Sequence, residues 1–218
     1  MNNIINLIRL DYYILKTFST GILLTAVGIA TLAGIISTNL PLIIGIVLMV
    51  SAFFMGSFFA VIEKNNVNKL YGILPVRKEQ IVIGRYLFTL FLGVMNAALA
   101  TLLTLVVSAI VSIKFSHLAL IAWFCGSFFL FCLLISIQFP IYFRYDFSKV
   151  SAIANTPVIL LFIISSAVIK KRPDLFNLTI TYFTHNQCMI WLMGIFGSML
   201  LLGVSMFLSA VLYGMRDL

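Results

Sequence analysis

Long apolar runs separated by short polar segments make up most of this 218-residue chain. Each run is close to the roughly 20 residues that a helix needs to cross about 30 Å of hydrocarbon. This pattern predicts an all-α polytopic membrane protein with six transmembrane helices in one domain, residues 1–218. The spans are expected near residues 18–37, 41–62, 84–112, 118–141, 151–169 and 187–212.

The N-terminal segment has a different, amphipathic pattern. Apolar residues recur there at helical spacing, at Ile4, Leu7, Ile8, Tyr12 and Leu15. Such a pattern predicts a short N-terminal interfacial helix over about residues 3–17, lying in the membrane–water boundary. A plain lead-in to the first span explains these residues equally well, so both interpretations stay open.

The composition also indicates a membrane protein. Hydrophobic residues make up 62% of the chain and charged residues only 9%, whereas soluble domains have roughly 25% charged residues. The net charge of +8 does not indicate nucleic-acid binding, because the basic residues lie in short loops and not on one face of a folded domain. The cysteines have no metal-ligand spacing, so no metal site is expected.

Basic residues determine the expected orientation in the membrane. With the N-terminus inside, ten of the 14 basic residues lie on the cytoplasmic side, and Lys114, Lys170, Lys171 and Arg172 lie outside. Because loops rich in Lys and Arg stay in the cytoplasm, both termini are expected to be cytoplasmic. The cluster at 170–172 argues for the opposite orientation, but the overall count outweighs it.

The chain has no sequence motif for chemistry of its own. It has no phosphate-binding loop and no hydrolase motif, so no catalytic residue is expected. The acidic residues lie at or outside the predicted span ends, at Asp11, Glu63, Glu79, Asp146, Asp174 and Asp217. A transporter driven by protons or sodium usually has ionisable groups at membrane depth, and none is expected here. The energy source is therefore expected in a partner protein.

Two charged connections lie on the expected cytoplasmic side. Residues 63–83 join the second and third spans, and Pro75 interrupts any helix there. The third span is longer than a bilayer needs, so its Arg85 end is expected to project into water. Residues 142–149 form the second connection, a candidate docking surface or a local set of ion pairs, with Arg144, Asp146 and Lys149.

The first connection resembles a loop of a known family. Leu74-Pro75-Val76, then Ile81-Val82 and Arg85-Tyr86, is similar to the first cytoplasmic loop of ABC-2-type transporter permeases. Arg77 departs from the family pattern, which usually has a small polar residue there. The resemblance implies a coupling helix that inserts into an ATPase, with contacts from Glu63, Lys69, Tyr71, Leu74, Pro75, Val76, Arg77, Lys78, Glu79 and Arg85.

The resemblance extends to the size and span count of small permeases that pair with a separately encoded ATPase. It implies a transport subunit without an ATPase site, acting as a homodimer with two ATPase copies in a bacterial plasma membrane. The partner would bind ATP and Mg, and this chain would hold no cofactor. The overall likeness is to exporters of amphipathic toxin peptides of the phenol-soluble modulin kind.

Small and weakly polar residues within the spans leave two interpretations open. Asn96, Thr104 and Ser108 on the third span either pack against neighbouring helices or line a path for an amphipathic substrate. Gln138 and Asn155 are expected to bond a neighbouring helix. Two small-residue faces either pack within the monomer or form a homodimer contact: Ala26, Ala30 and Gly34, and Gly194, Ser198, Ser205 and Ser209.

Two other functions fit the same composition and length. The chain would serve equally as a membrane-embedded, substrate-capturing subunit of a vitamin importer, with residues 170–185 capping a pocket near the outer face. A non-transport immunity or sensor protein of the membrane is the other alternative. An ATPase partner would distinguish both from an ABC-2 exporter.

Overall fold

The computed structural model describes the greater part of the chain, and all statements below concern that part. The described residues are 7, 11–13, 28–32, 34–35, 40–65, 67, 77–112, 117–171 and 192–215. Among these residues no strand occurs. The all-α prediction is therefore confirmed for the described part of the molecule.

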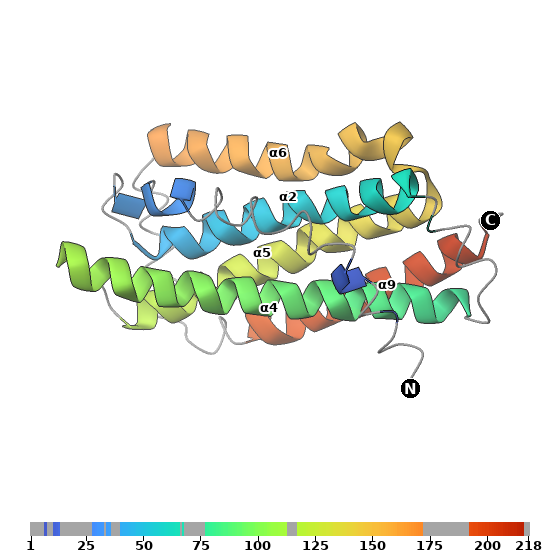
Figure 1. The fold of residues 1–218 in the computed structure, drawn as a ribbon. Helices are drawn as coiled ribbons and strands as arrows, with labels where there is room; N and C mark the ends of the chain where they lie inside the picture. The colour runs from blue at the N-terminus through green and yellow to red at the C-terminus, as the bar shows by residue number, and fades with distance from the viewer. Residues whose placement is uncertain are drawn as a thin grey trace.

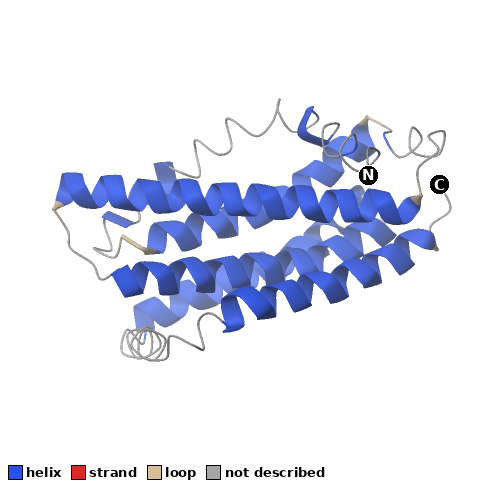
Figure 2. Cartoon of the chain, turned by 90° about the horizontal axis from the view of Figure 1, so that it is seen from below, coloured by secondary structure: helices blue, strands red, loops and turns tan. Residues whose placement is uncertain are grey.

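Long helices lie side by side along a common direction (Figures 1 and 2). They are α2 (Leu42–Lys64), α4 (Lys78–Val111), α5 (His117–Arg144), α6 (Phe147–Lys171) and α9 (Ser198–Gly214). A π-helical segment, η1 (Leu192–Gly197), leads directly into α9. α5 packs against α2, α4, α6 and α9, so it lies at the centre of the bundle.

Four helical segments of the described chain are long and apolar enough to cross a membrane: Leu42–Lys64, Lys78–Val111, Leu120–Arg144 and Gly194–Gly214. They confirm a multi-pass membrane protein. In α6 the apolar stretch among the described residues, Phe147–Leu161, is shorter. The first predicted span lies largely outside the described residues, where only 28–32 and 34–35 appear. The count of six spans and the N-terminal interfacial helix therefore stay predictions.

Helix boundaries differ from the predictions mainly at the charged connections. α2 begins directly after Pro41, as expected of a residue that lacks a backbone donor. α4 begins at Lys78 and not near residue 84, and its 34 residues give a length of about 50 Å. The predicted second loop, 142–149, is mostly helical, because only Tyr145 and Asp146 separate α5 from α6.

Small residues let the helices approach closely inside the monomer. A Cβ on Gly34 would lie 2.5 Å from Cγ1 of Ile43, and a Cβ on Gly194 would lie 2.8 Å from Cβ of Cys125. Ser205 and Ser209 are buried. Close backbone approach at small residues is a main source of helix association in lipid. The described members of both small-residue faces therefore pack within the chain.

The outer surface of the bundle is apolar. On α4, for example, Phe91, Leu102 and Ile110 are 60%, 59% and 76% exposed. Such side chains would be a liability in water, but they match hydrocarbon. This surface agrees with the membrane assignment.

One end of the bundle gathers most of the charged residues that the structure describes, and we call it the charged end. The C-terminal ends of α2, α5 and α9 and the N-terminal ends of α4 and α6 meet there (right in Figure 1). Its charged residues are Glu63, Lys64, Arg77, Lys78, Glu79, Arg144, Asp146 and Lys149. The two predicted connections and the end of α9 therefore lie on one side, as the sequence predicted.

Candidate functional site

Glu63, in the first charged connection, is hydrogen-bonded to the second charged connection. It lies at the end of α2, and its carboxylate accepts hydrogen bonds from the backbone N–H of Ser148 at 3.1 Å and from Ser148 Oγ at 2.6 Å. Ser148 is in the first turn of α6, where backbone N–H groups lack intrahelical acceptors. A negative charge also suits the positive end of the helix dipole. Glu63 thus acts as a cap supplied by a different helix.

The end of α9 is held by two cations from other helices. Lys78 Nζ donates to the carbonyl of Gly214 at 3.3 Å, and Arg144 Nη1 donates to the carbonyl of Met215 at 3.1 Å. The last carbonyls of a helix lack intrahelical donors and carry partial negative charge. Lys78 opens α4 and Arg144 closes α5, so these contacts join three helix ends.

Arg85 corrects the sequence analysis. It was expected in water, yet it is 2% exposed and lies in the third turn of α4. Its guanidinium carbon is 5.8 Å and 5.2 Å from the ring centres of Phe58 and Phe59 on α2, and 5.4 Å from that of Phe143 on α5. A cation over aromatic faces contributes about 2 kcal/mol per pair when desolvated. The expectation that the bundle interior holds no ionisable side chain is therefore wrong.

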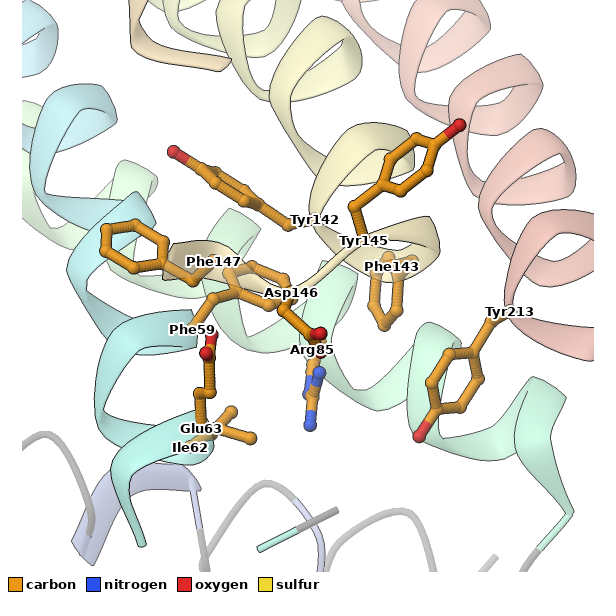
Figure 3. Close-up of a pocket in the computed structure, with 10 residues that line it drawn as sticks. All are labelled: Phe59, Ile62, Glu63, Arg85, Tyr142, Phe143, Tyr145, Asp146, Phe147 and Tyr213. Carbon is orange, nitrogen blue, oxygen red and sulfur yellow. The ribbon is translucent and has the colours of Figure 1, made fainter. Parts of the chain in front are cut away.

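Figure 3 shows Arg85 in a small pocket between side chains of several helices. The pocket contains about 280 Å³ of space free of atoms, part of it open to solvent. Two carboxylates, Glu63 and Asp146, also line it. Asp146 Oδ2 is 3.1 Å from Lys149 Nζ, an ion pair within the second connection. The complete lining is Phe59, Ile62, Glu63, Arg85, Tyr142, Phe143, Tyr145, Asp146, Phe147 and Tyr213.

The residue after Arg85 fixes α4 to α9. Tyr86 Oη lies 2.7 Å from Ser205 Oγ and 2.8 Å from Ser209 Oγ. Ser205 Oγ also donates to the carbonyl of Ser136 on α5 at 2.8 Å. All three hydroxyl residues are buried. The sequence showed the serines only as a small-residue face, and it gave no sign of the tyrosine that binds them.

The buried amide of Gln138 and the half-buried amide of Asn155 bond a neighbouring helix, as predicted. Gln138 Nε2 and Tyr142 Oη on α5 donate to Asn155 Oδ1 on α6, at 3.1 Å and 3.2 Å. α2 approaches the same place, since a Cβ on Gly56 would lie 2.6 Å from Tyr142 Oη. Nε2 of Gln138 and Oη of Tyr142 share Oδ1 of Asn155, so the cluster joins α5 to α6.

Apart from the buried Arg85, the predicted coupling residues fall into three groups. Arg77 and Glu79 are exposed at the start of α4, where a partner can reach them. Glu63 and Lys78 also contact other parts of the chain, as described above. Lys69, Tyr71, Leu74, Pro75 and Val76 lie outside the described residues.

The predicted substrate stripe lies partly inside the helix packing. Asn96 Nδ2 donates to Ser51 Oγ on α2 at 3.0 Å, and both residues are buried. Thr104 is fully buried and donates to the carbonyl of Ala100 within α4. Ser108 is half-buried. The hydrogen bond to Ser51 makes Asn96 part of the packing between α4 and α2. A substrate path along this stripe stays a prediction.

Comparison with known proteins identifies the family. A family model described as "ABC-2 family transporter protein" matches residues 6–214. Neither the curated proteins nor the solved structures yield a match to this chain. The family match covers nearly the whole sequence and agrees with the apolar helices and with the resemblance of the first charged connection. This chain belongs to the ABC-2 family of transporter proteins.

Proposed function

We propose that this permease exports amphipathic peptides or other hydrophobic molecules from a bacterial cell, as a homodimer driven by two copies of a separate ABC ATPase. Membership of the ABC-2 family makes the chain a membrane permease of an ABC transporter and implies an ABC ATPase partner. It also favours this function over a vitamin-capturing subunit or an immunity protein. Direction, cargo and homodimer belong to the proposal.

The observation that carries the proposal is the charged end. Arg77 and Glu79 are exposed at the first turn of α4, next to the residues whose sequence resembles a coupling loop. Because five helix ends meet at the charged end, a partner bound there can act on all of them. Both termini and the charged end would face the cytoplasm, where ATP is available. The proposal also includes six spans and the N-terminal interfacial helix.

The energy would come from nucleotide bound outside this chain. ATP and Mg would be held by the ATPase, and a change in its conformation would favour one arrangement of the helices over another. A ligand shifts such an equilibrium only by its difference in affinity for the two states. The ATPase must therefore bind the two states of the permease with different affinities depending on whether ATP is present. We propose that this binding occurs at the exposed start of α4.

The cargo class follows from the polarity of the helices. Among the described residues, the buried polar groups of the bundle are mostly hydroxyls and amides, and several of them bond a neighbouring helix. The apolar surfaces that remain suit an amphipathic or hydrophobic molecule. A strongly charged solute would need charged partners at membrane depth. Asp11 and Arg85 are buried charged residues of the described part of the chain, and aromatic rings surround Arg85.

Co-purification tests the proposal. The tagged chain should bring down an ATP-binding protein from the membranes of its source. The double variant Arg77→Glu and Glu79→Lys should reduce recovery of that protein by roughly tenfold or more, since reversed charges at an interface cost several kcal/mol and 1.4 kcal/mol is one factor of ten. Lys171→Glu, at the opposite end of α6, is the control and should leave recovery unchanged. Purification of the folded chain without any ATP-binding protein would refute the proposal.

A further inference from the structure

The position of Arg85 along α4 ties its movement to the end of the helix that a partner can reach. It lies seven residues after Lys78 in an unbroken helix, about 10 Å along the axis from the end that a partner can reach. The helix between them has no proline. A displacement of the start of α4 therefore carries Arg85 with it.

The guanidinium contacts two other helices at once. Phe58 and Phe59 belong to α2 and Phe143 to α5. A planar guanidinium stacks on aromatic faces better than a flexible ammonium does. The charge also resists transfer into hydrocarbon. When α4 moves, the guanidinium keeps these ring contacts only if the rings move with it.

The rings are themselves part of a larger cluster. Phe59 stacks on Tyr142 at 5.0 Å between ring centres, and Phe143 contacts Phe59 at 5.4 Å and Tyr213 of α9 at 5.4 Å. Edge and stacked contacts of this kind stabilise the cluster beyond the burial of the rings alone. The cluster therefore joins α2, α5 and α9 around one cation on α4, as Figure 3 shows.

We propose that Arg85 is the positioning residue that transmits ATP-driven displacement of α4 to α2 and α5. The inference rests on the proposed function, because it needs an ATPase that acts on the start of α4. Without the cation, α4 would still be displaced by the ATPase, but its movement relative to the ring cluster would no longer be resisted. Binding of the ATPase to α4 and transmission of movement from α4 to α2 and α5 are thus separate properties.

Two spin-label positions separate these properties. Leu87 on α4 and Ile137 on α5 are 49% and 41% exposed, so a label at either position points away from the core. In a background without native cysteines, each label gives one distance between the two copies of the dimer. Distances are measured in the complex with its ATP-binding subunit, without nucleotide and with ATP, Mg and vanadate. The label at Leu87 reports displacement of α4, and the label at Ile137 reports whether this displacement is transmitted to α5.

The variants are Arg85→Met, Arg85→Lys and the control Lys64→Met. Lys64 is an exposed basic residue at the same end, so the control removes the same charge without touching the ring cluster. Both labels should change distance in the parent. In Arg85→Met the change at Ile137 should fall to less than half while that at Leu87 remains. Arg85→Lys should recover only part of the change at Ile137, because an ammonium stacks less well on the rings, and Lys64→Met should behave like the parent.

Several results would overturn the inference. One is an Ile137 change in Arg85→Met equal to that of the parent, and another is an equal loss in Lys64→Met. If Leu87 moves in the parent and Ile137 does not, transmission through Arg85 is wrong while the proposed function stands. If no complex forms or neither label moves, the proposed function fails as well. Should Arg85→Met not fold, Phe143→Leu replaces it under the same criteria, since it removes one ring and keeps the cation.

Discussion

The hydroxyl of Tyr86 should be a measurable link between α4 and α9. It is within 2.8 Å of two serine hydroxyls on α9, and its ring is 5% exposed. The perturbations are Tyr86→Phe, the double change Ser205→Ala with Ser209→Ala, and all three together. Tyr86→Phe keeps the ring and its packing, so it removes mainly the hydrogen bonds.

The expected size follows from bonds between helices in membranes. Such bonds contribute about 0.6 kcal/mol on average and about 1.7 kcal/mol at most. Tyr86 makes two of them, so Tyr86→Phe should cost about 1.2 kcal/mol. The bond from Ser205 to Ser136 is lost in the serine variants whether or not Tyr86 is present, so it largely cancels in the double-mutant cycle. The coupling energy should therefore be about 1.2 kcal/mol, above the scatter of about 0.3–0.5 kcal/mol for independent sites.

The measurement is unfolding of the purified protein in mixed micelles with increasing denaturing detergent. Tyr145→Phe is the control, because Tyr145 is 53% exposed, and a surface change should stay within about 0.5 kcal/mol. Purely additive effects of Tyr86→Phe and the serine changes would refute the link. So would a Tyr86→Phe effect no larger than that of the control.

Two further changes test packing and capping. Gly93→Ala places a methyl group against the ring of Phe131 and should cost about 1–3 kcal/mol in the same titration, whereas Gly203→Ala meets nothing within 4 Å and should be neutral; equal stability of the two variants would contradict the packing. Glu63→Ala removes the acceptor of both Ser148 donors and should cost about 1 kcal/mol, with faster amide exchange in the first turn of α6. Unchanged exchange there would show that the cap has no effect.

The apolar pattern was enough to predict the four described helical segments that are long and apolar enough to cross a membrane. Run length depends on local composition, and hydrocarbon thickness sets the length required. α4 begins before the apolar run does. Lys78 and Glu79 lie outside the run, yet they belong to the helix, because helix formation beyond the hydrocarbon needs only satisfied backbone groups and not apolar side chains.

The position of Arg85 could not be predicted from its own neighbourhood. Arg85 is a basic residue six positions from the charged Glu79, so the local composition predicts that it is exposed to water. The rings that surround it come from Phe58 and Phe59 and from Phe143, which are distant in sequence. Burial here depends on tertiary packing, and phenylalanines are too frequent in this chain, at 20, to mark such a site.

The polar amides were easier to interpret. Gln138 and Asn155 each stand in an apolar helix, where an unbonded amide is costly, so a partner on another helix was the expected solution. Their mutual hydrogen bond confirms it. The identity of the third member, Tyr142, was not predictable, because a tyrosine also satisfies its hydroxyl at the membrane interface.

The sidedness of the charged end tests the central claim most directly. Arg77→Cys places a thiol at an exposed site of this end, and His117→Cys places one at the exposed start of α5 on the opposite end. A membrane-impermeant maleimide should label position 117 in intact cells and position 77 only in inside-out vesicles. Labelling of position 77 from outside intact cells would contradict the account, because no ATPase in the cytoplasm could then reach the start of α4.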